Sequence, residues 1–84
     1  MSIIIQDLKR LLSKLDYTNI SFVSHDEAKR LYYFDAMIDT HYRVMCEVKS
    51  DGIIEVHDTT FEIDNYVYIA TAYKKEDHWN LSLH

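Results

Sequence analysis

Two glutamates are the residues of this sequence that come nearest to a catalytic pair. Glu47 and Glu55 belong to neighbouring segments of two-residue alternation, which would place both carboxylates on one face of a sheet. Two such groups can act as general acid and general base when a pocket excludes water and shifts one pKa. The sequence indicates no pocket around them, so a small enzyme using carboxylates and His57 is the third of three hypotheses.

Five histidines and one cysteine are the other candidates for metal or nucleophile chemistry. The histidines form neither a helical pair nor a set with a Cys-x-x-Cys motif, and His57 and Asp58 point to opposite faces as neighbours on a strand. Cys46 stands between Val44 and Val48 on the expected core side, where burial raises the pKa of a thiol and makes it inert. We therefore expect no metal site, no cofactor and no cysteine nucleophile.

Motifs that depend on glycine are missing from the chain. With one glycine and no proline, it has no phosphate-binding loop, no dinucleotide fingerprint and no Gly-x-Ser-x-Gly turn. These features predict that the protein is not an enzyme.

A helix at the start of the chain is the first element available to position these residues. Residues 3–16 carry an apolar stripe at three-to-four spacing, which predicts an amphipathic helix. The stripe consists of Ile4, Leu8, Leu11, Leu12 and Leu15. Ser2 is the expected N-cap, and Asp7 and Arg10 stand at a spacing that favours an ion pair.

Alternation of apolar and polar residues replaces the helical pattern in the rest of the chain. The strands it predicts are 18–24, 31–39, 42–49, 53–58, with 59–63 as a continuation after a bend, 66–74 and 78–83. For 31–39 the alternative is a helix that continues from Ala28. Ser24 and Glu27 fit a capping box, so segment 24–30 is either a single helical turn or a polar loop.

Turns set how these strands pair. A three-residue loop at 50–52, with Gly52 at positive φ, opposes Val48 to Ile54 and keeps the apolar side chains on one face. The same logic gives two further three-residue loops, at 39–41 (Ile38 opposite Tyr42) and at 75–77 (Tyr73 opposite Trp79).

Successive hairpins make a meander, and one helix can cover one of its faces. The predicted fold is a single small α+β domain over residues 1–84. Its N-terminal amphipathic helix packs on one face of a twisted antiparallel sheet of about five to six strands. The expected core contains Leu8, Leu12, Phe34, Val44, Val56 and Trp79.

The other face of this sheet mixes carboxylates with Tyr and Met, residue types that are enriched in protein interfaces. The expected partner-binding residues are Tyr33, Asp35, Met37, Met45, Glu47, Glu55, Tyr66 and Tyr68. In the same register Ala70 and Ala72 face outward, whereas Val67, Ile69, Thr71 and Tyr73 face inward. Surface aromatic residues without a role, or a face covered by a second copy of the chain, are the alternatives.

Composition narrows the class of partner. The 84 residues carry a net charge of −5, and between Leu31 and Tyr73 eight acidic residues stand against two basic ones. An acidic surface disfavours direct binding of nucleic acid, and no run has the roughly 20 apolar residues that cross a bilayer. A single cysteine and the absence of a signal-peptide pattern make a reducing, cytoplasmic setting the simplest interpretation.

These observations favour a small acidic protein-binding module, an inhibitor or adaptor that docks its acidic, aromatic sheet face on a basic surface of a larger protein. One variant is a phage-type antagonist that blocks a nucleic-acid-binding site by placing carboxylates where phosphates would lie. The second hypothesis is a homodimeric regulator that binds a small ligand or a metal, and the enzyme is the third.

Overall fold

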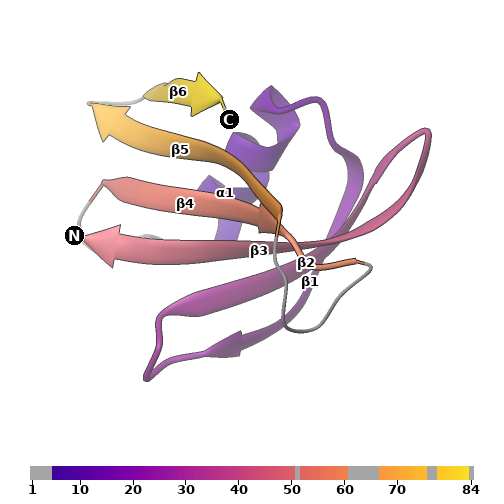
Figure 1. Ribbon diagram of the computed structural model, residues 1–84, viewed down its shortest axis with the longest axis horizontal. Helices are drawn as coiled ribbons and strands as arrows, with labels where there is room; N and C mark the ends of the chain where they lie inside the picture. Colours follow the sequence, from indigo (N-terminus) through magenta and orange to yellow (C-terminus); the bar gives the residue numbers. More distant parts are fainter. Residues whose placement is uncertain (1–4, 51, 61–66, 76–77, 84) are drawn as a thin grey trace.

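A computed structural model describes residues 5–50, 52–60, 67–75 and 78–83. Within these residues the chain forms one helix followed by six antiparallel strands, which lie in one sheet in the order of the sequence. The elements are α1 (Ile5–Lys14), β1 (Thr18–Asp26), β2 (Leu31–Ile38), β3 (Thr40–Ser50), β4 (Ile53–Asp58), β5 (Val67–Lys75) and β6 (His78–Leu83). The helix lies on one side of the twisted meander, so the predicted α+β architecture is confirmed (Figure 1).

The helix α1 is held to the sheet by its leucine stripe. Leu8, Leu11 and Leu12 have no exposed surface, and Asp7 pairs with Arg10 at 3.5 Å as the spacing predicts. Burying a leucine stabilises a fold by about 1.5–3 kcal/mol, which makes this stripe a main source of stability. The expected N-cap Ser2 lies outside the described residues.

The end of α1 is a Schellman motif. The backbone N–H of Tyr17 donates to the Leu12 carbonyl at 3.2 Å, and that of Asp16 donates to the Ser13 carbonyl at 3.1 Å. Asp16 has a φ of 73°, the left-handed conformation that this cap requires. The motif turns the chain so that Tyr17 enters the core beside Leu12 and β1 begins directly afterwards.

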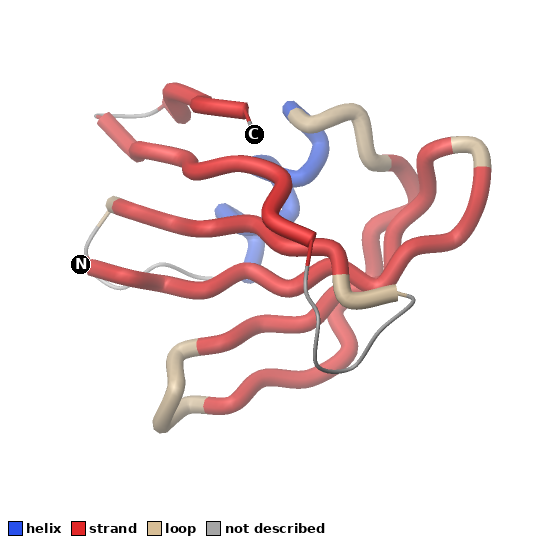
Figure 2. The backbone as a smooth tube through the Cα atoms, in the orientation of Figure 1, coloured by secondary structure: helices blue, strands red, loops and turns tan. Residues whose placement is uncertain are grey.

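The core fills the space between α1 and the inner face of the sheet. In Figure 2, which has the orientation of Figure 1, the helix lies behind the strands. All six residues expected in the core are buried in one cluster: Leu8, Leu12, Phe34, Val44, Val56 and Trp79. The predicted placement of the helix across the apolar face is therefore confirmed.

The turn between β3 and β4 keeps the predicted pairing of Val48 with Ile54 but is one residue shorter than predicted, because Ser50 pairs with Ile53 after a register shift that follows Val48. Gly52 has a φ of 80°, and Val48 lies opposite Ile54 as expected. A Cβ at position 52 would lie 3.2 Å from the carbonyl oxygen of Lys74, so glycine serves both the φ and the close approach of β5.

The turn between β2 and β3 is shorter than predicted. Asp39 alone, with a φ of 63°, reverses the chain, so Ile38 pairs with Thr40 and not with Tyr42. The register moves by two residues, which leaves the faces of β2 and β3 as predicted.

Segment 24–30 adopts the loop alternative. β1 continues to Asp26, whose carboxylate accepts the N–H of Lys29 at 3.2 Å. The Arg30 N–H donates to the Glu27 carbonyl at 3.3 Å, and the φ of 57° at Arg30 turns the chain into β2. The helical turn is therefore wrong, because the side chain of Asp26 supports a hairpin turn here.

The largest correction concerns β5. Ala70 and Ala72, expected outward, are fully buried opposite Val56 and Ile54. The pairing changes register between Val56 and His57. Because of this irregularity, the inward and outward positions of β5 alternate in opposite phase before and after it. Thr71 and Tyr73 therefore align with the outward residues Glu55 and Ile53, the reverse of the prediction.

The last hairpin is shifted by one residue from the expected register. Lys74 pairs with Trp79, whereas the prediction paired Tyr73 with Trp79. The Lys74 ammonium lies 5.8 Å from the centre of the Trp79 ring and 3.3 Å from the Asp7 carboxylate, so this lysine occupies a core-side position by pairing its charge. Leu83, expected inward, is 71% exposed at the end of the edge strand.

Candidate functional site

The outer face of the sheet is the side opposite α1. Strand pairing aligns its residues in rows that cross β2 to β5, because directly paired residues point to the same side. One row contains Leu31, Glu47, Glu55 and Thr71, and the next contains Tyr33, Met45, His57 and Tyr68. The expected partner-binding positions fall mainly in and beside these two rows.

A cluster of two carboxylates and one imidazole lies where the two rows meet on β3 and β4. Glu47 is paired directly with Glu55, and the Nε2 atom of His57 lies 3.2 Å from Oε1 of Glu55. One potential ligand atom from each of the three residues lies within 4.8 Å of the other two. The side chains are 32%, 24% and 14% exposed for Glu47, Glu55 and His57, so the cluster is half-buried and still accessible. We call it the Glu47–Glu55–His57 cluster.

The β3–β4 hairpin produces this arrangement. Glu55 and His57 are two residues apart on one strand, which places both side chains on the same face. The turn at Gly52 then sets the register that brings Glu47 of the neighbouring strand opposite Glu55. Lys49, on the same strand as Glu47, reaches its carboxylate at 3.7 Å.

His57 is the member of the cluster that the sequence prediction did not include in the partner-binding set. His57 and the neighbouring Asp58 lie on opposite faces, as predicted, since His57 pairs with Met45 and Asp58 with Val44. The useful signal was the Glu-x-His spacing of Glu55 and His57, because a strand brings residues two apart to one side.

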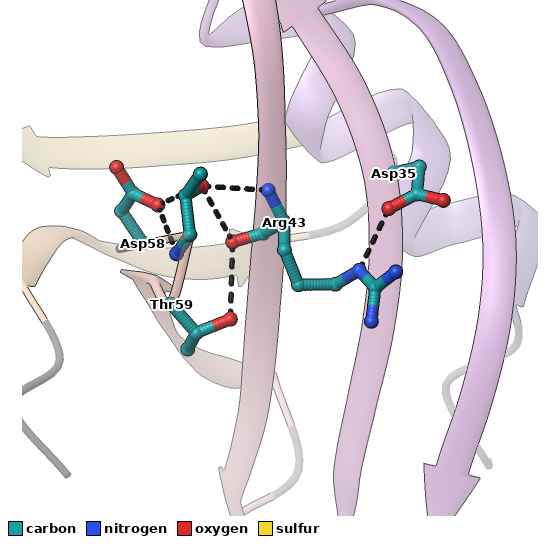
Figure 3. Close-up of polar contacts among 5 residues, drawn as sticks. Asp35, Arg43, Asp58 and Thr59 are labelled. Atoms are coloured by element: carbon teal, nitrogen blue, oxygen red, sulfur yellow. Dashed lines mark hydrogen bonds and ion pairs between the residues drawn. The ribbon is translucent and has the colours of Figure 1, made fainter. Parts of the chain in front are cut away.

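A second polar group lies at the other end of β3, around Arg43 (Figure 3). The Arg43 side chain donates from Nε to Asp35 at 2.7 Å, which pairs the charges of these two outer-face residues. Its backbone carbonyl accepts the N–H of Thr59 at 2.8 Å, and its N–H donates to the Thr60 hydroxyl at 2.7 Å. Asp58 accepts the Thr60 N–H at 2.8 Å, so this group fixes the chain where β4 ends.

Not all expected partner-binding residues are equally accessible. Met45 is only 3% exposed, which makes the expectation of a solvent-exposed Met45 wrong. Its strand is central, and it lies between the paired positions Tyr33 and His57 on either side. Bulky neighbours on both sides cover an outward methionine in such a row.

The remaining positions divide into two groups. The side chains of Tyr33, Asp35 and Met37 are half-buried on β2, and Asn19 donates to the Met37 sulfur at 3.5 Å. The backbone of Tyr68 is paired with that of His57, and Tyr66 lies outside the described residues. The described part of the predicted set is therefore centred on β2, β3 and β4.

Cys46 lies on the inner face and is fully buried. Burial raises the pKa of its thiol to about 12, as expected for an inert structural cysteine. Tyr17 behaves in the same way, because burial and then the nearby charge of Asp58 raise its pKa to about 12. Both groups belong to the core and stay protonated at neutral pH.

Comparison of the chain with protein-family models, with curated proteins and with solved structures gave no match in any of the three. Among the described residues, no helix has the length and apolar composition needed to cross a membrane.

Proposed function

We propose that the chain is a small non-enzymatic protein-binding module whose outer sheet face docks on a basic surface of a larger protein. The observation that carries the proposal is the direct pairing of Glu47 with Glu55 on the face opposite the helix. Like charges in directly opposed positions are destabilising. A basic partner group placed over this pair would offset the repulsion between the two carboxylates. Binding would then relieve a repulsion that lowers the stability of the free chain.

The distribution of charge across the molecule supports a basic partner. The outer surface of α1 carries the bases Lys9, Arg10 and Lys14. On the opposite face three carboxylates, those of Asp35, Glu47 and Glu55, outnumber the two bases Arg43 and Lys49. A molecule with faces of opposite sign orients a charged partner before contact. A basic surface is therefore steered toward the sheet and away from the helix.

Contact area for such a complex comes from β2. Tyr33 and Met37 lie half-buried on the same face as the carboxylates, and both residue types are enriched at interfaces. We assign the affinity mainly to these side chains and the rate of association mainly to Glu47 and Glu55.

One form of the proposed module is an inhibitor. A basic surface with a groove for nucleic acid would meet carboxylates where phosphates otherwise bind. In that case the chain and a nucleic acid compete for the partner, and an adaptor would show no such competition.

Capture and kinetics with matched charge variants test the proposal. Glu47→Gln with Glu55→Gln removes two negative charges from the outer face, and Asp16→Asn with Glu27→Gln removes two from exposed positions outside it. We expect a protein captured from source-cell lysate by the wild type and by the second variant to be lost with the first. With the purified partner, the first variant should associate at least about tenfold more slowly at low salt.

Equal association rates for the two variants would contradict the proposal. So would sedimentation showing that the chain alone forms a dimer which the Glu47 and Glu55 changes abolish, because a second copy would then occupy the face.

A further inference from the structure

We propose that Glu47, Glu55 and His57 form a binding site for a divalent transition-metal ion of the Zn²⁺ or Mn²⁺ class. One imidazole nitrogen and two carboxylate oxygens would hold the ion, and the coordination positions facing solvent would remain open. The isolated chain contains all three ligands, so the site needs no partner, although a bound ion would compete with a basic partner group for Glu47 and Glu55.

The geometry of the hairpin suits a metal ion. Around a tetrahedral ion with ligand distances of about 2.1 Å, neighbouring ligand atoms lie roughly 3.4 Å apart. The His57 Nε2 and Glu55 Oε1 atoms are already 3.2 Å apart, and all three ligand atoms fall within 4.8 Å of one another. Small rotations of the Glu47 side chain would close the remaining distance without moving the strands.

Electrostatics also favours a cation at this position. Two carboxylates face each other on the paired strands, and both are less than one-third exposed. The Lys49 ammonium lies 3.7 Å from the Glu47 carboxylate and is 46% exposed, which makes it a weak counter-charge. A doubly charged ion bound between Glu47 and Glu55 would neutralise both.

The donor set selects the class of metal. A nitrogen donor from His57 favours Zn²⁺ over Mg²⁺ and Ca²⁺, which prefer all-oxygen sites, and the two carboxylates also suit Mn²⁺. Cys46, which would select softer ions, lies on the inner face of β3 and is fully buried. The site therefore resembles one for a metal ion of intermediate hardness, with three protein ligands on a rigid sheet.

Calorimetric titration of the chelator-treated chain with ZnCl₂ and with MnCl₂ tests the proposal, with thermal unfolding as a second readout. We expect one ion per chain and a melting temperature that rises with metal concentration. His57→Gln and Glu55→Gln should each weaken binding at least about tenfold. His41→Gln and Asp35→Asn alter a histidine and a carboxylate elsewhere on the outer face and should leave affinity unchanged.

Circular dichroism confirms folding before each titration, and the Glu55 variant serves if the His57 variant unfolds. Absence of binding by the wild type overturns the proposal. Equal affinity of the wild type and the two ligand variants also overturns it, because the metal would then bind elsewhere. Either result leaves the partner proposal standing, since that proposal requires no metal.

Discussion

Glu47 on β3 and Glu55 on β4 are paired directly across the sheet, and each has a positive or titratable neighbour on its own strand. Lys49 lies 3.7 Å from Glu47, and His57 lies 3.2 Å from Glu55. The hairpin thus holds two carboxylates together on a face that the helix leaves uncovered. This relationship underlies both proposals made above.

The first prediction concerns the cost of this pairing in the free chain. Glu47→Gln should raise the free energy of unfolding by about 0.5 kcal/mol at low salt with chelator present, because it relieves the repulsion from Glu55. Urea denaturation measures the change. Asp35→Asn is the control and should act in the opposite direction, since Asp35 is paired with Arg43 at 2.7 Å. A Glu47→Gln variant less stable than the wild type would contradict this prediction, because losing the pair with Lys49 would then outweigh any relief of repulsion from Glu55.

The second prediction concerns the attachment of the helix. Leu12 is fully buried in the core cluster, so Leu12→Ala should lower the free energy of unfolding by about 2–5 kcal/mol. Ser13→Ala, at the exposed neighbouring position, should change it by less than about 0.5 kcal/mol. Equal melting temperatures for the wild type and Leu12→Ala would show that α1 does not form part of the core.

The third prediction concerns the turn that sets the register of the cluster. Gly52 has a φ of 80°, and Gly52→Val should lower the free energy of unfolding by about 1–2 kcal/mol, because a β-branched residue resists this conformation. Gly52→Asn also adds a Cβ near the Lys74 carbonyl but tolerates positive φ, so it should cost less. A larger loss in the Asn variant than in the Val variant would contradict the assignment.

The fourth prediction concerns alkaline pH. The pKa of Cys46 rises from 9.0 to about 12 in the folded chain, and that of Tyr17 rises from 10.0 to about 12. Above pH 9 the unfolded chain therefore loses these protons first, and the folded state binds more of them. The free energy of unfolding should be unaffected by these groups below pH 9. It should then fall as the pH rises toward 12, by up to about 1.4 kcal/mol per pH unit for each group.

Cys46→Ala separates the two contributions. The fall in stability should then begin near pH 10, where tyrosine ionises in the unfolded chain. A decline that begins at pH 9 in this variant would show that the thiol is not its source.

Much of the fold could be predicted because the apolar spacing and the turn residues indicate the same helix and the same strand pairing over most of the chain. The leucine stripe predicts the face of α1, and Gly52 predicts the β3–β4 register, on which the Glu47–Glu55 pair depends. At Asp39 the predicted loop was too long, yet the faces survived because the error was two residues.

The errors occur where side-chain packing overrides the alternation of apolar and polar residues. Alternation in β5 is ambiguous, since apolar residues occupy both faces, and the register change near His57 is not visible in composition. Ala70 and Ala72 are small enough to lie fully buried on the inner face, whereas Tyr73 is 46% exposed. Met45 is buried on the outer face by its cross-strand neighbours, which a single strand's pattern does not show.

The most direct test of the proposed docking face is carboxylate footprinting of the chain with its captured partner. Carbodiimide-activated labelling followed by mass spectrometry reads each acidic residue separately, so Asp16 and Glu27 serve as controls within the same molecule. We predict that Glu47 and Glu55 are labelled in the free chain and protected in the complex, with Asp16 and Glu27 labelled in both. Unchanged labelling of Glu47 and Glu55 in the complex would contradict the account.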